Sequence, residues 1–147
     1  MVTKRKGRRK GVSLIKSKAT VIDGIKFKSR LEAHAYKELK KAKIKFKYEE
    51  DKFTLVEGFK PISHSWEFRY KKFAPVQNAI RSITYTPDFI CPDMNWVIET
   101  KGRPNESFPL RWKLFKRYIH STGKPTILFL PTNRSQVDIC IEQILKL

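Results

Sequence analysis

The sequence lacks the features that mark several large classes of protein. Its two cysteines, Cys91 and Cys140, stand alone, so no CxxC pair predicts a zinc finger or a redox motif. No two of its three histidines have a spacing that would make them metal ligands on one helix face. The longest apolar runs, such as 126–130, are far shorter than the roughly 20 residues of a membrane helix, and no apolar signal segment follows the basic N-terminus. We therefore expect a cytoplasmic protein with reduced core thiols and no membrane partner.

Acidic residues are scarce relative to basic ones. The chain of 147 residues has 14 acidic and 32 basic side chains, a formal net charge of +18. Charge of this sign and density predicts a polyanionic partner, because neutralising phosphates releases condensed counterions. Nucleic acid is the first candidate, since no clean basic amphipathic helix supports binding to an anionic membrane. The alternative is a protein whose charge serves only solubility.

The positive charge is concentrated toward the N-terminus. Residues 1–20 contain no acidic residue, and the first fifty residues hold 17 basic and 5 acidic side chains. We expect a flexible arm that tracks DNA, and the alternative is a solvated tail or a localisation signal. The remainder, 21–147, shows no repeat or linker and is predicted to be a single domain. The arm residues expected to contact DNA are Lys4, Arg5, Arg8 and Arg9.

Hydrophobic periodicity predicts a mixture of helices and strands. It indicates three helices, at 29–43, 107–121 and 134–146. Alternating or continuous apolar runs indicate strands at 44–48, 52–56, 83–91, 96–101 and 124–130, the last of them buried. The segment 64–73 alternates aromatic and charged residues and is predicted to be a hairpin arm paired with the chain leading into 80–91. This order of elements predicts an α/β domain with a mixed central sheet.

Each predicted helix has an apolar stripe that is expected to face the core. The stripe of the first helix is Leu31, Ala35, Leu39 and Ala42, after an N-cap at Ser29. The stripe of the second is Leu110, Leu114 and Tyr118. The stripe of the third is Val137, Ile141, Ile144 and Leu145, with a possible capping box at 135–138.

Two acidic residues and a lysine occupy the strands 83–91 and 96–101. Glu99 and Lys101 share one face of their strand because side chains alternate. The turn residues between the strands make them neighbours, which can bring Asp88 to the same edge. Two buried like charges are unfavourable unless a cation lies between them, and Mg²⁺ binds through one or two carboxylates. The alternative is an exposed Glu–Lys pair beside an ordinary turn aspartate.

Such a constellation suits phosphodiester hydrolysis. A bound divalent cation acidifies a water molecule and polarises the phosphate, and Lys101 would stabilise the developing negative charge. Pro87 enforces an extended approach to Asp88, and Gly102 permits a tight exit where a DNA backbone could come close. These residue types therefore predict a nuclease centre at Asp88, Glu99 and Lys101.

The same residues carry a family resemblance. TyrThrProAspPhe (85–89) and GluThrLysGly (99–102) resemble the PD-(D/E)XK nuclease superfamily. With PheLysSerArgLeuGlu (27–32) and IleLysPheLysTyrGluGlu (44–50), the chain is similar to the phage endonuclease I family of Holliday junction resolvases. It is also similar to phage-encoded nuclease-like proteins of less certain role that share the opening at 23–27. The resemblance covers roughly residues 22–130.

The resemblance implies a restriction-endonuclease-like core, a central sheet flanked by helices. It implies Mg²⁺ or Mn²⁺ bound by Asp88, Glu99 and the backbone carbonyl of Thr100, with Lys101 as the catalytic lysine. Glu32 would assist the metal site, and it could equally be the third residue of a capping box with Ser29. The chain departs from those resolvases in having Lys47 where they have a glutamate. Its segment 57–82 is longer, and their intertwined dimer depends on this region.

In the predicted helix at 107–121, basic residues alternate with aromatic residues, and the basic residues are expected to contact phosphates. Outside the N-terminal arm, the residues expected to bind DNA are Arg30, Arg103, Arg111, Lys113, Lys116 and Arg117. The predicted function is a metal-dependent endonuclease that resolves branched DNA, as a homodimer because the two cuts are symmetric. The alternatives are a nicking or sequence-specific phage nuclease on the same fold, and a non-catalytic nucleic-acid-binding protein.

Overall fold

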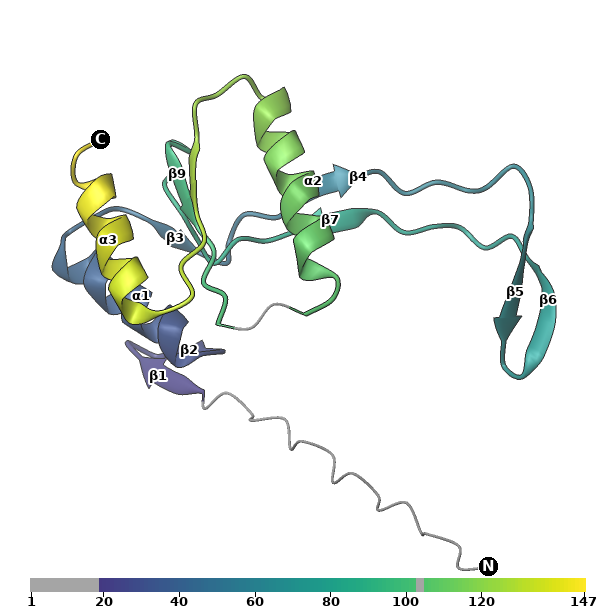
Figure 1. Ribbon diagram of the computed structural model, residues 1–147, viewed down its shortest axis with the longest axis horizontal. Coiled ribbons are helices and arrows are strands. Elements are labelled where there is room, and N and C mark those ends of the chain that lie inside the picture. The colour runs from purple at the N-terminus through teal and green to yellow at the C-terminus, as the bar shows by residue number, and fades with distance from the viewer. Residues whose placement is uncertain (1–18, 103–104) are drawn as a thin grey trace, which may run out of the picture.

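Three helices and ten short strands make up the part of the protein that its computed structural model describes, residues 19–102 and 105–147 (Figure 1). The helices are α1 (Arg30–Lys41), α2 (Phe108–Ser121) and α3 (Arg134–Ile144). The strands are β1 (Thr20–Ile22), β2 (Ile25–Phe27), β3 (Lys47–Tyr48), β4 (Phe53–Val56), β5 (Ser65–Arg69), β6 (Lys72–Val76), β7 (Ile83–Tyr85), β8 (Phe89–Ile90), β9 (Trp96–Ile98) and β10 (Ile127–Phe129). The fold is mixed α/β, as predicted. Most of the predicted basic arm lies outside the described residues.

The largest sheet has the strand order β10-β9-β8-β3. Strands β8 and β9 are antiparallel neighbours, β3 pairs antiparallel with β8, and β10 pairs parallel with β9. The predicted mixed central sheet is therefore confirmed. The predicted strand 83–91 is two strands, β7 and β8, because the chain leaves the β7 pairing at Thr86–Pro87 before β8 begins.

Helices cover both faces of this sheet, and the alternation of side chains decides which residue meets which helix. Phe89, Trp96 and Ile98 pack in one buried cluster with residues of α1 and α3. Ile90 and Val97, which point the other way, pack with the aromatic residues of α2. Cys140 is buried in the first cluster and Cys91 packs against it, both as free thiols. Cys140 is thus a core thiol, as predicted, whereas Cys91 is half-buried at the edge of the core.

The helices begin and end close to their predicted limits, but two of their inward faces differ. In α1, Ala35 and Leu39 are buried as predicted. In α2, the buried residues are Phe108, Trp112, Phe115 and Ile119, so the centre of the inward face differs from the predicted stripe, of which Tyr118 packs against this cluster. Leu110 is exposed because the larger aromatic rings, one turn apart on the neighbouring face, take the core side. In α3, Leu145 is exposed because it follows the last helical turn.

The N-terminus of α3 also differs from the predicted capping box. The N-cap is Asn133, whose side chain accepts a hydrogen bond from the N–H of Gln136 at 2.9 Å. The Gln136 side chain accepts in return from the N–H of Thr132 at 2.7 Å. The helix cap therefore starts two residues earlier than the predicted Ser135, because an Asn in extended conformation at this position caps the first turn, and the Gln136 side chain reaches one residue beyond the N-cap N–H.

Strand pairing shows further differences from the predictions. The hairpin β1–β2 was not expected. The predicted hairpin arm is present: β5 pairs with β6, at the start of the chain that leads into 80–91. The turn lies at Tyr70 and Lys71, so the predicted segment 64–73 already includes the first residues of the partner strand, and β7 pairs with β4. Strand β10 lies at the sheet edge with Ile127 exposed, and the predicted full burial of 124–130 is wrong.

A long extension leaves the body of the protein between β4 and β7, and we call residues 57–82 the projecting arm (Figure 1). Its two sides are joined by a bridge between Phe59 and Ile80, and the hairpin β5–β6 forms its far end. None of the helices in the described part is long and apolar enough to cross a membrane.

Candidate functional site

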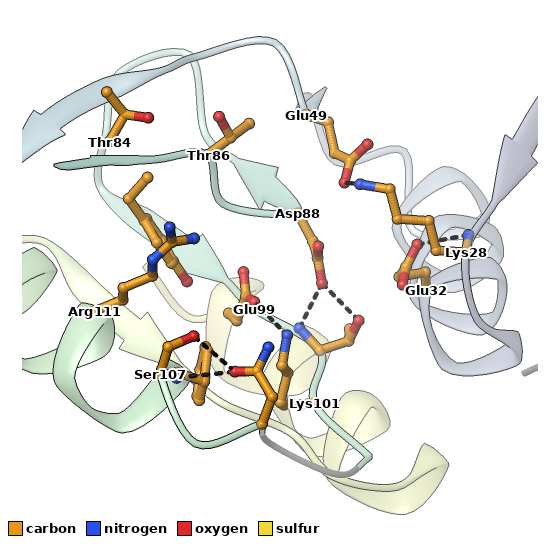
Figure 2. A pocket seen from close by; sticks show the side chains of 14 residues that line it. Lys28, Glu32, Glu49, Thr84, Thr86, Asp88, Glu99, Lys101, Ser107 and Arg111 are labelled. Atoms are coloured by element: carbon orange, nitrogen blue, oxygen red, sulfur yellow. Dashed lines mark hydrogen bonds and ion pairs between the residues drawn. The ribbon is translucent and has the colours of Figure 1, made fainter. Parts of the chain in front are cut away.

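The register of the central sheet brings Asp88 and Glu99 together. Phe89 pairs with Ile98 and Ile90 with Val97, so the next residues along the two strands, Asp88 and Glu99, stand opposite each other. Both carboxylates are buried. Figure 2 shows them side by side in one cavity. The predicted convergence of these two residues at one edge of the sheet is thus what the structure contains.

Thr100 holds Asp88 in place. Its backbone N–H and its hydroxyl both donate hydrogen bonds to Oδ2 of Asp88, at 2.7 and 2.6 Å. The sequence predicted only a role for the Thr100 carbonyl oxygen. The clamp fixes the orientation of the carboxylate, because two short donors from one residue leave it little rotational freedom.

Lys101 is held beside Glu99. Its ammonium nitrogen lies 3.6 Å from Oε1 of Glu99, so the predicted common face of these two residues is confirmed. The same nitrogen lies 4.7 Å from the centre of the Phe108 ring, the first residue of α2. The backbone N–H of Lys101 donates to the carbonyl of Pro131 at 3.0 Å. The lysine is thereby positioned between the central sheet and the start of α2.

Burial dominates the electrostatics of the two carboxylates. It raises the pKa of Asp88 to about 7, reinforced by the adjacent charge of Glu99 and opposed by the Thr100 hydrogen bonds. Burial also raises the pKa of Glu99, against the opposing influence of Tyr85 and Lys101. Two ionised carboxylates in this position therefore need a proton or a cation close by.

Two buried polar atoms at the site, Oε2 of Glu99 and the hydroxyl of Tyr85, form no well-formed hydrogen bond with any described residue, although the two side chains are close enough for Tyr85 to lower the pKa of Glu99. Burial and the nearby Glu99 raise the pKa of Tyr85, so this hydroxyl stays protonated. A buried carboxylate oxygen without a partner is costly and points to a ligand that would satisfy it.

Glu32 lies in the same cavity and is also part of the helix start. Its backbone N–H donates to the hydroxyl oxygen of Ser29 at 3.1 Å, which is the predicted N-cap. Its Oε2 accepts from the hydroxyl of Tyr48 and from the backbone N–H of Lys28, both at 3.0 Å. The side chain therefore reaches one residue beyond the Ser29 N–H of the predicted capping box. It both stabilises the helix start and lines the cavity.

Glu49 and Lys28 also line the cavity, beside Asp88 and Glu32. The sequence did not predict either of them as a site residue. The backbone N–H of Glu49 donates to the carbonyl of Asp88 at 3.0 Å, so Glu49 flanks Asp88 on the side opposite Glu99. Its carboxylate forms an ion pair with Lys28, which raises the pKa of that lysine. The sequence signal for Glu49 was the pair Glu49–Glu50 directly after the predicted strand 44–48. That signal could point to the site only if the strand next to Asp88 had been known.

The cavity has a volume of about 340 Å³ and lies between the central sheet, the start of α1 and the start of α2 (Figure 2). Of the basic residues expected to bind DNA, Arg111 lines this cavity. Lys113, Lys116 and Arg117 are exposed elsewhere on α2. Arg30 lines a different hollow together with Lys37 and Arg134. The other predicted DNA contacts lie outside the described residues, namely Lys4, Arg5, Arg8, Arg9 and Arg103.

Comparison with known proteins assigns the chain to one family. A family of proteins of unknown function, DUF1064, matches residues 12–126. The chain belongs to the DUF1064 family. No curated protein and no solved structure matches it. The family match spans the cavity and the projecting arm but ends before α3.

The donor set of this DUF1064 protein bears on which metal it could hold. Within residues 19–102 and 105–147, no group of three or more His, Cys, Asp or Glu side chains is placed to hold a metal ion. A closed structural site of the zinc type therefore does not fit. Two adjacent buried carboxylates, one with an unsatisfied oxygen, do fit a cation that takes most of its ligands from water and substrate.

Proposed function

We propose that the protein is a metal-dependent DNA endonuclease with Asp88, Glu99 and Lys101 as its catalytic centre. One observation carries the proposal: two buried carboxylates and a lysine meet at the wall of one cavity in a chain of net charge +18. A purely structural Glu–Lys pair would be expected at an exposed surface, where such pairs contribute little. Here Glu99 is buried and Asp88 is clamped beside it.

The proposed cofactor is Mg²⁺ or Mn²⁺, held by Asp88 and Glu99 with the Thr100 carbonyl as a further ligand. The unsatisfied Oε2 of Glu99 and the raised pKa of Asp88 support a cation between the two carboxylates. When bound, such an ion supplies an acidified water and polarises a phosphate oxygen. Glu32 stays a candidate for assisting at this site, from the opposite wall of the cavity.

The protein's own groups have distinct parts in the proposed reaction. Asp88 and Glu99 provide negative charge, and the Thr100 clamp keeps Asp88 oriented during turnover. The Lys101 ammonium stabilises the negative charge that develops on the scissile phosphate. Arg111, on the α2 side of the cavity, would bind a neighbouring phosphate of the same strand.

We further propose a restriction-endonuclease-like core and branched DNA as the substrate. The mixed sheet with helices on both faces and the carboxylates at its edge support this core. Resolution of a junction needs two symmetric cuts, so we expect a homodimer acting in the cytoplasm. Two surfaces with exposed apolar residues are candidates for such an interface, the hairpin segment 64–73 and the C-terminal helix with Leu145 and Leu147 after it.

The decisive experiment compares a four-way junction with a linear duplex of the same sequence, each with Mg²⁺ and with EDTA. Metal-dependent cutting of the junction alone is expected. Cutting of both substrates would favour a nicking or sequence-specific nuclease on the same fold. Binding of both without cleavage in Mg²⁺ or Mn²⁺ would end the enzymatic proposal and favour a non-catalytic DNA-binding protein.

Two variants locate the chemistry. Asp88→Asn and Lys101→Met should each lose cleavage by several hundredfold or more, roughly the loss known for single electrostatic groups, while junction binding in EDTA persists. The matched control is Lys146→Met, which removes the same charge from an exposed position after α3. Equal cleavage by Lys101→Met and Lys146→Met would show that Lys101 is not the catalytic lysine.

A further inference from the structure

The hairpin at the end of the projecting arm has one aromatic face. Phe68 pairs with Phe73, and Trp66 pairs with Pro75. Because cross-strand partners and alternate residues share a face, all four side chains lie on the same side of the hairpin. Their exposed fractions are high: 57% for Trp66, 73% for Phe68 and 65% for Phe73. The rings of Trp66 and Phe73 lie 5.5 Å apart and form one continuous surface.

The opposite face of the hairpin has no aromatic ring, and its polar groups bond to one another beside Ala74 and Val76. Glu67 accepts hydrogen bonds from the hydroxyl of Ser65 at 2.6 Å and from Nε of Arg69 at 2.7 Å. The hairpin also stands away from the body of the protein (Figure 1). An isolated two-stranded hairpin is only marginally stable, so an uncovered aromatic face on it calls for a partner.

Positive charge stands at the tip of the hairpin and again at the root of the projecting arm. At the tip, Tyr70 and Lys71 form the turn with positive φ angles of 51° and 63°, and Tyr70 is 96% exposed. Lys72 follows the turn and, as the partner of Arg69, lies on the face opposite the rings. At the root, outside the hairpin, Lys60 and Arg81 lie on the two sides of the arm. The arm thus combines exposed rings with basic residues at its tip and its root.

We infer that the aromatic face of β5–β6 is a stacking platform for unpaired nucleobases, with the lysines at the hairpin tip contacting the adjoining phosphates. This inference rests on the proposed function, because it takes DNA as the partner. Sequence-tolerant recognition of single strands combines these two elements, rings that stack on bases and a positively charged path for the backbone. In duplex DNA the nucleobases are stacked on one another, so their faces are not free to stack on these rings.

A second copy of the chain is the other occupant to consider for this face. Two hairpins stacked with their tips together would bring Lys71 and Lys72 of both copies close to one another. Each copy also carries a net charge of +18. Like charges in close contact are unfavourable, whereas a polyanion is attracted to the lysines of the tip. Charge complementarity therefore favours a nucleic acid strand.

The platform defines a substrate class for the proposed nuclease. A substrate with unpaired or easily unstacked bases, such as a branch point or a single-stranded flap, would engage both the cavity and the arm. Intact duplex would engage the cavity and the basic surfaces alone. The arm would thereby favour branched DNA without reading its sequence.

Trp66 is a built-in reporter for this face, because Trp96 and Trp112 are buried. The experiment measures acrylamide quenching of tryptophan fluorescence in the full-length protein, in EDTA so that no cleavage occurs. A short oligothymidylate should protect Trp66 from quenching, and a duplex of equal length should protect it far less. Protection that rises with protein concentration in the absence of DNA would overturn the inference in favour of a second copy.

Substitutions at Phe68 separate stacking from general apolarity. Phe68→Leu keeps an apolar side chain but removes the ring, and it should weaken oligothymidylate binding by about tenfold or more. Phe68→Tyr keeps a ring and should retain binding, and Val21→Thr, at an exposed position of β1, is the matched surface control. Equal binding by Phe68→Leu and Phe68→Tyr overturns the inference. If the protein cuts DNA but Trp66 stays accessible to the quencher, this inference alone is wrong. If the protein binds no DNA, the proposed function is wrong as well.

Discussion

At the scale of single residues, the site is a pair of buried acids whose protonation is linked to folding. The pKa of Asp88 is raised to about 7 in the folded protein from an ordinary value of 3.8. Between these values the folded state holds a proton that the unfolded chain has released. The contribution of Asp88 to stability without a divalent cation should therefore be greatest below about pH 4 and fall as the pH rises toward 7, by about 1.4 kcal/mol for each unit of the shift.

The measurement is the melting temperature in EDTA from pH 5 to 7.5, for the wild type and for Asp88→Asn. The variant should lose most of this pH dependence, because asparagine keeps an oxygen for Thr100 but does not ionise. Addition of Mg²⁺ at pH 7.5 should raise the melting temperature of the wild type and not of the variant. Parallel pH profiles for the two proteins would contradict the assignment of a raised pKa to Asp88.

The Thr100 clamp leads to a second residue-scale prediction. Thr100→Val removes the hydroxyl that donates to Asp88 and keeps the backbone N–H and the side-chain shape. Cleavage should fall by roughly tenfold, because a positioned charged group loses one of its two donors, and unfolding free energy should drop by about 1 kcal/mol. Thr100→Ser retains the hydroxyl and should cleave nearly as the wild type does; a serine variant as weak as the valine one would show that the hydroxyl is not the relevant group.

The core of this candidate site was predictable, and its surroundings were not. Alternation along one strand places Glu99 and Lys101 on one face, and a tight turn places Asp88 opposite, so local rules suffice. Glu49 required knowing that β3 lies on the far side of Asp88, a contact between distant parts of the chain. The Thr100 clamp depends on a side-chain rotamer, which no sequence pattern specifies.

At the scale of elements, the hydrophobic periodicity of the sequence predicted the three helices, but one hairpin signal was not interpreted. The hairpin β1–β2 turns at Asp23 and Gly24, whose φ angles of 51° and 78° are those of a tight hairpin turn. An Asp-Gly pair between alternating apolar residues is a strong hairpin signal, and it was overlooked. The prediction of the inward face of α2 failed for another reason. Apolar residues occur on more than one side of this helix, and the side with the larger aromatic rings packs against the core.

The projecting arm depends on a close approach of its two sides at Gly58. A Cβ atom there would lie 2.8 Å from the carbonyl oxygen of Ile80 and 3.0 Å from the backbone nitrogen of Ser82. Both are backbone atoms, so Gly58→Ala should separate the two sides near the Phe59–Ile80 bridge. We expect faster amide hydrogen exchange in residues 59–80 with little change in the central sheet.

The control for the arm is Gly102→Ala, since a Cβ atom at Gly102 would meet nothing within 4 Å. This variant should leave exchange in the arm unchanged. If the inference about the aromatic face holds, Gly58→Ala should also weaken protection of Trp66 by oligothymidylate. Identical exchange in the two variants would mean that the arm tolerates a side chain at its root.

At the scale of the whole molecule, the protein has a mixed α/β body, an acidic cavity and an excess of positive charge around it. The carboxylates of the cavity repel phosphate unless a cation is present, whereas the rest of the chain attracts it. DNA affinity should therefore come mainly from surfaces outside the cavity, and the cavity should select the phosphate to be cut. This division explains why loss of Asp88 is expected to abolish cleavage while binding persists.

The N-terminal segment contributes to that attraction through its composition alone. Residues 1–18 contain eight basic and no acidic side chains. Each phosphate contact adds about 0.9 to the slope of log affinity against log salt concentration. Removing residues 1–18 should therefore flatten the slope by several units, up to about seven, and weaken binding most at low salt. Titrations of a four-way junction in EDTA at several salt concentrations measure this slope, and an unchanged slope would mean that these bases make no phosphate contacts and that the body alone accounts for DNA affinity.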